Sequence, residues 1–449
     1  MAGRKNFSKL IAFISSCLFA FSFAFPEQTS SPWNNLPQKK TLDNGLAMIY
    51  QKDDSSAMTV LRILIKGGKG AEHRGQQGLA YLTTRLTLEI PDSGKIQDLM
   101  NQSSHLSVTC KGDYSLIHLE CLSENLEEFL KIVSKVILDP LFSGLRIDFI
   151  KKQMLHQRKL EEDDAINLGH NAHLKAFFAD EGYGGLVFGG EESLKAIKNK
   201  DISSFYENYF NAANMLISVS SDLDEMKVLG AIQKYFKELP SGKGAELHPK
   251  SASTPEERKV FIEKDTKQSL ISIAFPLPKI SSKNFVLGFM VENLLGKGVG
   301  SKLWVLRSKE KLAYTVNSQA TQMKEGGILE AYLETDKEKK DLALESLKRL
   351  LRELFDNGIA EEELQMTKIY SKGDFLRANE IKTTRTANLA ILEALGLGYE
   401  FLSKLFQEID TVSLEEINAY IKEILNPEKS VEVIVGLKDE ITLPLTSKF

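Results

Sequence analysis

Cysteine is scarce in this sequence, which has three among 449 residues. So few cysteines exclude a fold held together by a framework of disulfides. Long apolar runs are also rare: residues 10–24 form one that is too short to span as a membrane anchor, and no other stretch is long and apolar enough to cross a bilayer. Positive charge is not in excess, since 57 lysines and arginines face 61 aspartates and glutamates. A net charge of −4 repels phosphates, so we expect no nucleic-acid partner.

The apolar run follows a basic N-terminal stretch and includes two small residues near its end, Ser22 and Ala24. This pattern predicts a secretory signal peptide over residues 1–24 and a mature chain that starts near Phe25. Removal of three positive charges changes the net charge from −4 to −7. We therefore expect an exported protein without a membrane span, located in the periplasm.

A rival interpretation takes "ISSC" (14–17) as a lipid-attachment sequence with Cys17 acylated. The apolar run continues past Cys17, which is unusual directly after a lipidated cysteine, so the cleaved signal peptide is preferred.

The other two cysteines, Cys110 and Cys121, lie in strand-like segments on either side of "KGDYS". An oxidising compartment permits a disulfide between them. Simple hairpin register does not place them opposite each other, however, and two buried free thiols are the other interpretation.

One order of predicted elements occurs twice: two strands, a helix, a strand pair, a helix and a final helix–strand unit. A chain of 449 residues is too long for one core of usual size, which agrees with duplication. The first copy comprises 45–51, 58–68, 78–90, 105–110, 115–121, 122–138 and 202–221, and the second 259–265, 269–277, 282–295, 313–320, 327–335, 337–354 and 416–436.

We therefore predict an α+β protein of two homologous domains, 34–239 and 257–445, each a mainly antiparallel sheet covered by helices. Residues 240–256 between them are rich in glycine, proline and serine and show no apolar period, so they are predicted to be a linker. The turn "DNG" (43–45) before the first strand is a hairpin signal.

Several segments carry a family resemblance that covers nearly all of the mature chain: "LDNGLAMIY" (42–50), "GLAYLTTRL" (78–86), "YGGLVFGGEESLKAI" (183–197), "ISSFYENYFNAANMLISVSSDLD" (202–224) and "LLGKGVGSKLWVLRSKEKLAYTV" (294–316). The chain resembles the pitrilysin or insulinase family of zinc metallopeptidases (M16), in its short-chain branch of processing peptidases. The last segment is the most specific.

Members of that family bind zinc through His-x-x-Glu-His on the first helix and a glutamate from a later helix. The resemblance places Tyr81, Thr84 and Arg85 at the motif positions, one turn apart on one helix face, and Gln157 at the third-ligand position. Every ligand and the catalytic base are therefore absent, and a permanent cation at Arg85 disfavours a substitute metal. We expect a degenerate zinc site, and no metal or other cofactor bound by this chain.

The resemblance also implies an arginine and a tyrosine, seven residues apart in the second domain, that hold the substrate backbone and the tetrahedral intermediate. "LRSKEKLAY" supplies Arg307 and Tyr314. A guanidinium and a phenol suit that role because both donate hydrogen bonds to a developing oxyanion. The other interpretation is a helix-end arginine in a surface ion pair and a tyrosine packed in its sheet.

This combination resembles the non-catalytic subunit of the family's two-subunit peptidases. We expect a partner subunit that carries the His-x-x-Glu-His helix and the zinc, and a peptide substrate enclosed between the chains and bound by strand addition. The alternatives are a scaffold or peptide-binding pseudopeptidase with no part in catalysis, and a peptidase active by itself through an unconventional site.

Two further motifs have simpler interpretations. His170 and His173 lie at i and i+3 on a predicted helix near "EEDD" (161–164), but no third metal ligand accompanies them, so a solvated helix face is predicted. "GKGVGSK" (296–302) is glycine-rich like a phosphate loop but lacks its lysine–serine pair in register. We interpret it as a connection between helices.

Overall fold

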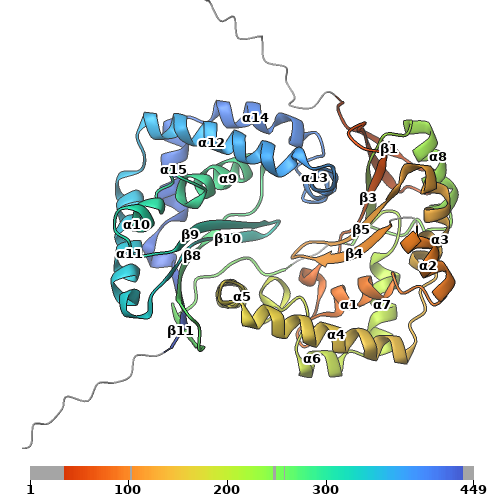
Figure 1. The fold of residues 1–449 in the computed structure, drawn as a ribbon, viewed down its shortest axis with the longest axis horizontal. Helices are drawn as coiled ribbons and strands as arrows, with labels where there is room; N and C mark the ends of the chain where they lie inside the picture. Colours follow the sequence, from red (N-terminus) through yellow and green to blue (C-terminus); the bar gives the residue numbers. More distant parts are fainter. Residues whose placement is uncertain (1–34, 102–103, 246–248, 257, 438–449) are drawn as a thin grey trace, which may run out of the picture.

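The computed structural model describes residues 35–101, 104–245, 249–256 and 258–437 (Figure 1). The predicted signal peptide, including Cys17, and the predicted start at Phe25 lie outside these residues. Among the residues that are described, none of the helices is both long and apolar enough to cross a membrane.

The first domain is built on a six-stranded sheet in the order β1-β2-β6-β3-β5-β4. Its pairs are antiparallel except for β2 with β6, which is parallel. The strands are β1 (Gln38–Thr41), β2 (Ala47–Lys52), β3 (Met58–Ile65), β4 (His105–Cys110), β5 (Ser115–Leu122) and β6 (Met215–Ser221).

The second domain repeats this topology in a five-stranded sheet in the order β7-β11-β8-β10-β9. Again a single pair, β7 with β11, is parallel and the others are antiparallel. The strands are β7 (Lys259–Glu263), β8 (Ser269–Leu277), β9 (Thr315–Met323), β10 (Gly326–Thr335) and β11 (Val431–Gly436). The α+β prediction and the duplication are confirmed, because β2, β6, β3, β5 and β4 correspond in order and direction to β7, β11, β8, β10 and β9.

Helices cover both sheets (Figure 1). Those of the first domain are α1 (Leu79–Leu86), α2 (Ser93–Asn101), α3 (Leu126–Leu138), α4 (Gly144–Asp163), α5 (Ala165–Phe178), α6 (Glu191–Ala196), α7 (Asn199–Tyr209) and α8 (Glu225–Phe236). Those of the second are α9 (Ser282–Gly296), α10 (Trp304–Ser308), α11 (Lys340–Asn357), α12 (Glu361–Glu380), α13 (Lys382–Ala394), α14 (Phe401–Thr411) and α15 (Leu414–Ile424). Short 3-10 turns are Lys69–Ala71, Ser123–Asn125, Gly182–Gly184, Lys337–Lys339 and Pro427–Lys429.

The central strands are buried on both faces and mainly apolar, because both faces are covered. In β3 every residue after Met58 is buried, and in β8 only Pro276 is partly exposed. A sheet covered on both faces requires such continuous apolar runs. The β1–β2 hairpin confirms the predicted turn: Gly45 has φ of 92°, which glycine adopts without a steric cost.

One helix of each domain packs on the sheet of the other domain. Helix α5 contacts β8, β10 and β11, while α13 contacts β2, β3 and β6. Leu174 and Phe177 of α5 belong to one apolar cluster with Leu270 and Val433 of the second sheet. The two domains therefore share buried apolar surface, so neither sheet is fully covered by helices of its own domain.

The turns of the two equivalent hairpins also meet between the domains. The carboxylate of Asp113, in the β4–β5 turn, accepts a hydrogen bond of 3.0 Å from the backbone N–H of Lys324, in the β9–β10 turn. The buried hydroxyl of Tyr183 donates to the same carboxylate. These bonds join the corresponding hairpins of the two halves.

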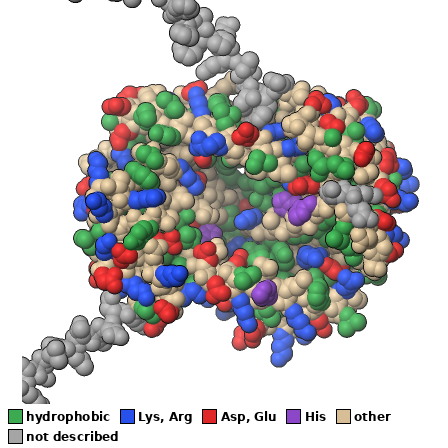
Figure 2. Space-filling model, in the orientation of Figure 1, with side chains coloured by type: hydrophobic (Ala, Val, Ile, Leu, Met, Phe, Trp, Pro, Cys, Tyr) green, Lys and Arg blue, Asp and Glu red, His purple; other side chains and the backbone are tan. Residues whose placement is uncertain are grey.

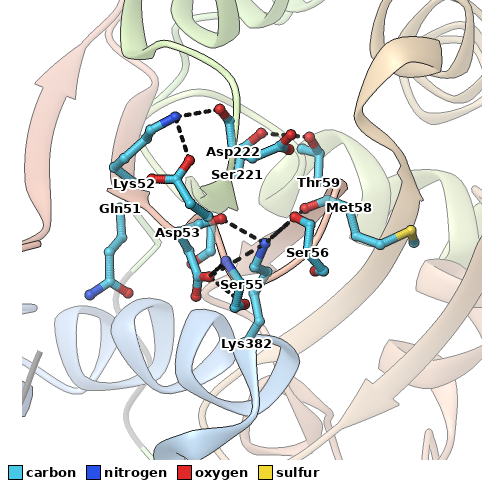
Figure 3. A network of polar contacts seen from close by, with 12 residues as sticks. Gln51, Lys52, Asp53, Ser55, Ser56, Met58, Thr59, Ser221, Asp222 and Lys382 are labelled. Atoms are coloured by element: carbon cyan, nitrogen blue, oxygen red, sulfur yellow. Dashed lines mark hydrogen bonds and ion pairs between the residues drawn. The ribbon is translucent and has the colours of Figure 1, made fainter. Parts of the chain in front are cut away.

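Buried charges anchor α13 to the first domain (Figure 3). The ammonium of Lys382 extends into the loop between β2 and β3 and donates to the carbonyl oxygens of Asp53, Ser56 and Met58 at 2.8, 3.0 and 3.1 Å. The guanidinium of Arg385 pairs with the carboxylate of Asp53. All three charged side chains are at most 8% exposed. A buried ion group is therefore part of the contact on this side of the domain boundary.

Two histidines of α5 make polar contacts with the sheet of the second domain. His170 Nδ1 lies 2.5 Å from a carboxylate oxygen of Glu330, and His173 Nε2 lies 2.9 Å from the hydroxyl of Ser272. His173 is fully buried, and burial lowers its pKa to about 4. The prediction that this face is solvated is therefore wrong, because the face packs on a sheet that is more than 95 residues away along the chain.

The predicted linker, the glycine-rich segment and the two cysteines lie outside the contacts described so far. Residues 240–245 and 249–256 contain neither helix nor strand. Residues 296–302 connect α9 to α10, as expected for a connection between helices. Cys110 and Cys121 are buried free thiols, and their register partners are Ser115 and Thr59.

Candidate functional site

Helix α1 begins at Gly78, whose φ of 93° lies in the left-handed region. The buried carboxylate of Glu72 accepts hydrogen bonds from the backbone N–H groups of Gly78 and Ala80 at 3.2 and 2.9 Å. Burial raises the pKa of Glu72 to about 8, in spite of these two bonds and nearby Lys69. Glu72 thus orients the start of the helix that carries the degenerate motif, a role that the sequence analysis missed.

Three of the four positions predicted to form a degenerate zinc site line one pocket of about 560 Å³ between α1 and α4. Tyr81 and Arg85 come from α1, and Gln157 comes from α4. Thr84 does not line the pocket: it is fully buried, and its hydroxyl donates to the carbonyl of Ala80 at 2.8 Å. The structure therefore brings together Tyr81, Arg85 and Gln157, whereas Thr84 turns away from them.

Ion pairs hold the guanidinium of Arg85 beside this pocket. Arg85 Nη1 lies 2.5 Å from Glu89 Oε1, and Arg146 Nη1 lies 2.6 Å from Glu89 Oε2. Two cations therefore share one carboxylate. Zinc sites in proteins use imidazole, thiolate and carboxylate ligands, none of which these positions offer. The residues do not fit zinc, and the described part of the chain holds no cluster of three or more potential metal ligands.

Tyr81 packs edge-on against Phe188, with ring centroids 4.8 Å apart. Burial raises the pKa of the Tyr81 hydroxyl, so this group stays protonated at neutral pH. At the position of a metal ligand the pocket thus has a neutral hydrogen-bond donor.

Arg307 and Tyr314 lie in the second domain, at α10 and directly before β9. Both side chains are exposed, Tyr314 by 58%. The guanidinium of Arg307 lies over the ring of Trp304, 4.9 Å from its centroid. Tyr314 is therefore not packed inside its sheet, and the alternative interpretation of this tyrosine as a packing residue is wrong.

The segment between these two residues folds back on α10. The backbone N–H of Leu312 donates to the carbonyl of Leu306 at 2.9 Å, and that of Tyr314 donates to Glu334 at 3.0 Å. Lys311 has φ of 54°, which an L-residue seldom adopts. The return loop is thus fixed by its backbone, and it leaves the guanidinium and the phenol accessible to a ligand.

Each sheet has two edge strands, β1 and β4 in the first and β7 and β9 in the second, and β4 and β9 belong to the equivalent hairpins. In the described residues β4 pairs only with β5, and β9 pairs only with β10. The face seen in Figure 2 is hollowed at its centre, between the two domains, and apolar and basic side chains are visible in the hollow. Unpaired edges are the usual places for strand addition.

Two family models match adjoining parts of the chain. The model described as insulinase (peptidase family M16) matches residues 47–186, and the one described as the peptidase M16 inactive domain matches residues 196–370. Together they span most of both domains.

Curated relatives show similarity over most of the chain. A Helicobacter pylori protein named non-peptidase homolog YmxG is 26% identical over 385 residues, which are 84% of this chain and 88% of the relative. A shorter match is to the mitochondrial-processing peptidase subunit alpha-1 of Dictyostelium discoideum, 22% identical over 44% of this chain and 31% of that protein.

A solved structure from Pseudomonas fluorescens, described as a peptidase M16 inactive domain, superimposes with a TM-score of 0.81. It is 21% identical and covers 90% of this chain and 98% of its own. The duplicated topology and the two family models agree: this chain, whose sequence contains no His-x-x-Glu-His, belongs to the insulinase family of peptidases, M16.

Proposed function

We propose that this chain is the non-catalytic subunit of a two-subunit zinc peptidase. The observation that carries the proposal is the contrast between its two candidate sites. At the degenerate zinc site, Arg85 and Tyr81 replace metal ligands, whereas Arg307 and Tyr314 are exposed as an accessible pair of donors. Such donors can act in catalysis when another chain supplies the metal.

In this proposal a partner subunit contributes the His-x-x-Glu-His helix and the zinc, which polarises the peptide carbonyl and activates water. This chain contributes Arg307 and Tyr314, which donate hydrogen bonds to the oxyanion, and strand edges that hold an extended peptide. The names of two relatives support the proposal in different ways: one is a non-peptidase homologue, and the other is a subunit of a processing peptidase.

The place of action in this proposal is the periplasm. The basic stretch and apolar run at the N-terminus support export through a cleaved signal peptide. Mass analysis of the native protein tests this point: a start near Phe25 supports it, and a lipid on Cys17 contradicts it.

Purification from native envelopes, with metal analysis, tests the subunit proposal first. We expect co-purification of a second M16 chain with one zinc per pair, and no zinc on the isolated chain. One zinc per isolated chain, lost together with peptidase activity when His170 is replaced, would contradict the proposal.

Kinetics of the reconstituted pair then test the two donors. Arg307→Ala and Tyr314→Phe should leave the complex assembled but lower kcat, Arg307→Ala by about 100- to 1,000-fold, since oxyanion donors act in the transition state. Lys309→Ala and Tyr370→Phe are matched controls, because both residues are also exposed in this domain. If both donor variants retain full activity, the chain is instead a scaffold or a peptide-binding pseudopeptidase.

A further inference from the structure

The pocket between α1 and α4 has the size and the apolar walls of a ligand site. Its volume of about 560 Å³ lies within the usual range for small-ligand sites. Four apolar side chains contribute to its lining: Phe149, Ile150, Met154 and Phe188. Phe149 is 52% exposed, which is a large apolar area for a side chain on a helix surface. The pocket can therefore bury an apolar group of a ligand.

The charged groups of this pocket are all of one sign. Arg85 and Lys152 line it, and no acidic residue appears among its described lining. Glu89 lies next to Arg85 but is shared with Arg146, so this trio has a net charge of +1. Lys152 is exposed and makes no ion pair with a described residue. An anionic group that entered the pocket would meet an uncompensated positive potential.

Neutral hydrogen-bond donors accompany the two cations. The hydroxyl of Tyr81 makes no hydrogen bond to a described residue, and neither does the side-chain amide of Gln157. Both residues line the pocket together with Arg85 and Lys152. A carboxylate accepts several hydrogen bonds and donates none, so it matches this set of donors.

We propose that this pocket binds the free C-terminal carboxylate of a peptide that ends in an apolar residue. The carboxylate lies between Arg85 and Lys152 and accepts from Tyr81, while the last side chain packs against Phe149 and Phe188. The pocket at the predicted degenerate zinc site thus binds an anion in this chain. Since the pocket belongs to one chain, the proposal does not depend on a partner subunit and is tested with the isolated protein.

Fluorescence anisotropy with a labelled hexapeptide ending in leucine provides the test. The peptide with a free carboxylate should bind at least about 10-fold more tightly than the same peptide with a C-terminal amide, because it adds charge-assisted hydrogen bonds. An amide-capped peptide with an internal glutamate should bind as weakly as the plain amide. Equal affinity of the acid and either amide would overturn the proposal.

Substitutions at two exposed pocket positions test whether the peptide binds in this pocket. Lys152→Met should weaken binding of the acid form by about 10-fold, while Gln157→Trp, which fills the pocket, should abolish it. Lys131→Met is the matched control, since Lys131 is exposed on α3 outside the pocket. Because both pocket positions are solvent-exposed, their variants are expected to fold. Unchanged binding in both variants would place the peptide elsewhere and overturn the proposal.

N-acetyl-leucine distinguishes a peptide C-terminus from a small organic acid. We expect it to compete at least about 10-fold more weakly than the hexapeptide, because a peptide also contacts the rim of the pocket. Competition equal to that of the peptide would show a small-acid site and contradict the peptide assignment.

Discussion

Helices α5 and α13 are exchanged between the two domains, yet chemically different contacts hold them. Helix α13 enters the first domain with Lys382 and Arg385, which meet the carboxylate of Asp53 in a buried environment. Helix α5 enters the second domain with His170 and His173, of which the second is fully buried and paired with a hydroxyl. The two helices occupy equivalent positions in the two halves, but different polar contacts hold them there.

This difference has consequences for stability. A buried charge is costly unless it is paired, so the α13 contact depends on every member of its ion group. Protonation of a buried imidazole adds the cost of a buried charge, so the α5 contact depends on pH. Deletion of the Asp53 carboxylate should therefore weaken the α13 contact, and acid should weaken the α5 contact.

Removal of the buried carboxylate should have the largest effect. Asp53→Asn leaves Lys382 and Arg385 buried without a counter-ion, and we expect a loss of about 3–5 kcal/mol in the free energy of unfolding. The urea midpoint at pH 7 measures this loss. Asp54→Asn is the control, since Asp54 forms an exposed pair with Lys52 and its loss should cost less than about 1 kcal/mol. Equal midpoints for the two variants would show that the α13 ion group does not stabilise the domain boundary.

Lowering the pH should reduce the free energy of unfolding through His173, by less than the loss expected for Asp53→Asn. Burial lowers the pKa of His173 to about 4, below its usual value of 6.5. Between these two values the unfolded chain binds the proton and the folded chain does not, so stability falls as the pH falls. From pH 7 to pH 5 we expect a loss of about 2 kcal/mol from this group.

Urea midpoints at pH 7 and pH 5 check this expectation, with His173→Asn as the variant that should lose this part of the pH dependence. His118 is the control, because burial also lowers its pKa to about 4 but it lies on β5, away from the α5 contact. His118→Gln should keep the part due to His173. An unchanged pH dependence in His173→Asn would exclude protonation at the α5 contact.

The smallest expected effect comes from a neutral hydrogen bond on the α13 side. The buried hydroxyl of Thr386 donates to the carbonyl of Lys382 and lies beside Ser220 Oγ, both at 2.7 Å. Thr386→Val should cost about 1 kcal/mol. Thr411→Val, at an exposed hydroxyl, should cost less in the same denaturation experiment. A loss as large as that of Asp53→Asn would show that charge is not what distinguishes this contact.

Much of the fold could be predicted because it is local. The apolar runs of β3 and β8 and the turn at Gly45 follow from residue type and spacing alone. The repeated order of elements then predicted two equivalent sheets, and their strand orders confirm it. The family resemblance was equally accessible, since it depends on short segments such as 294–316.

The candidate site was predicted only in part. The sequence predicted that Tyr81, Thr84 and Arg85 share a helix face, but Thr84 is buried and bonded to its own helix. Helical spacing cannot show this, because three positions at i, i+3 and i+4 subtend a wide arc and the packing of α1 decides which of them reach the pocket. Glu72 was missed because a single glutamate in a loop has no spacing signal.

The sequence by itself determined the strands and helices of the repeated unit and the duplication, because these depend on residue type and on neighbours along the chain. Only the tertiary structure decided which helix covers which sheet. His173 meets Ser272, and Lys382 meets the loop after β2, across more than 95 and more than 320 residues of chain. From the sequence alone, a polar residue on a helix is predicted to face solvent. Its burial depends on the distant segment that packs against it and not on its neighbours along the chain.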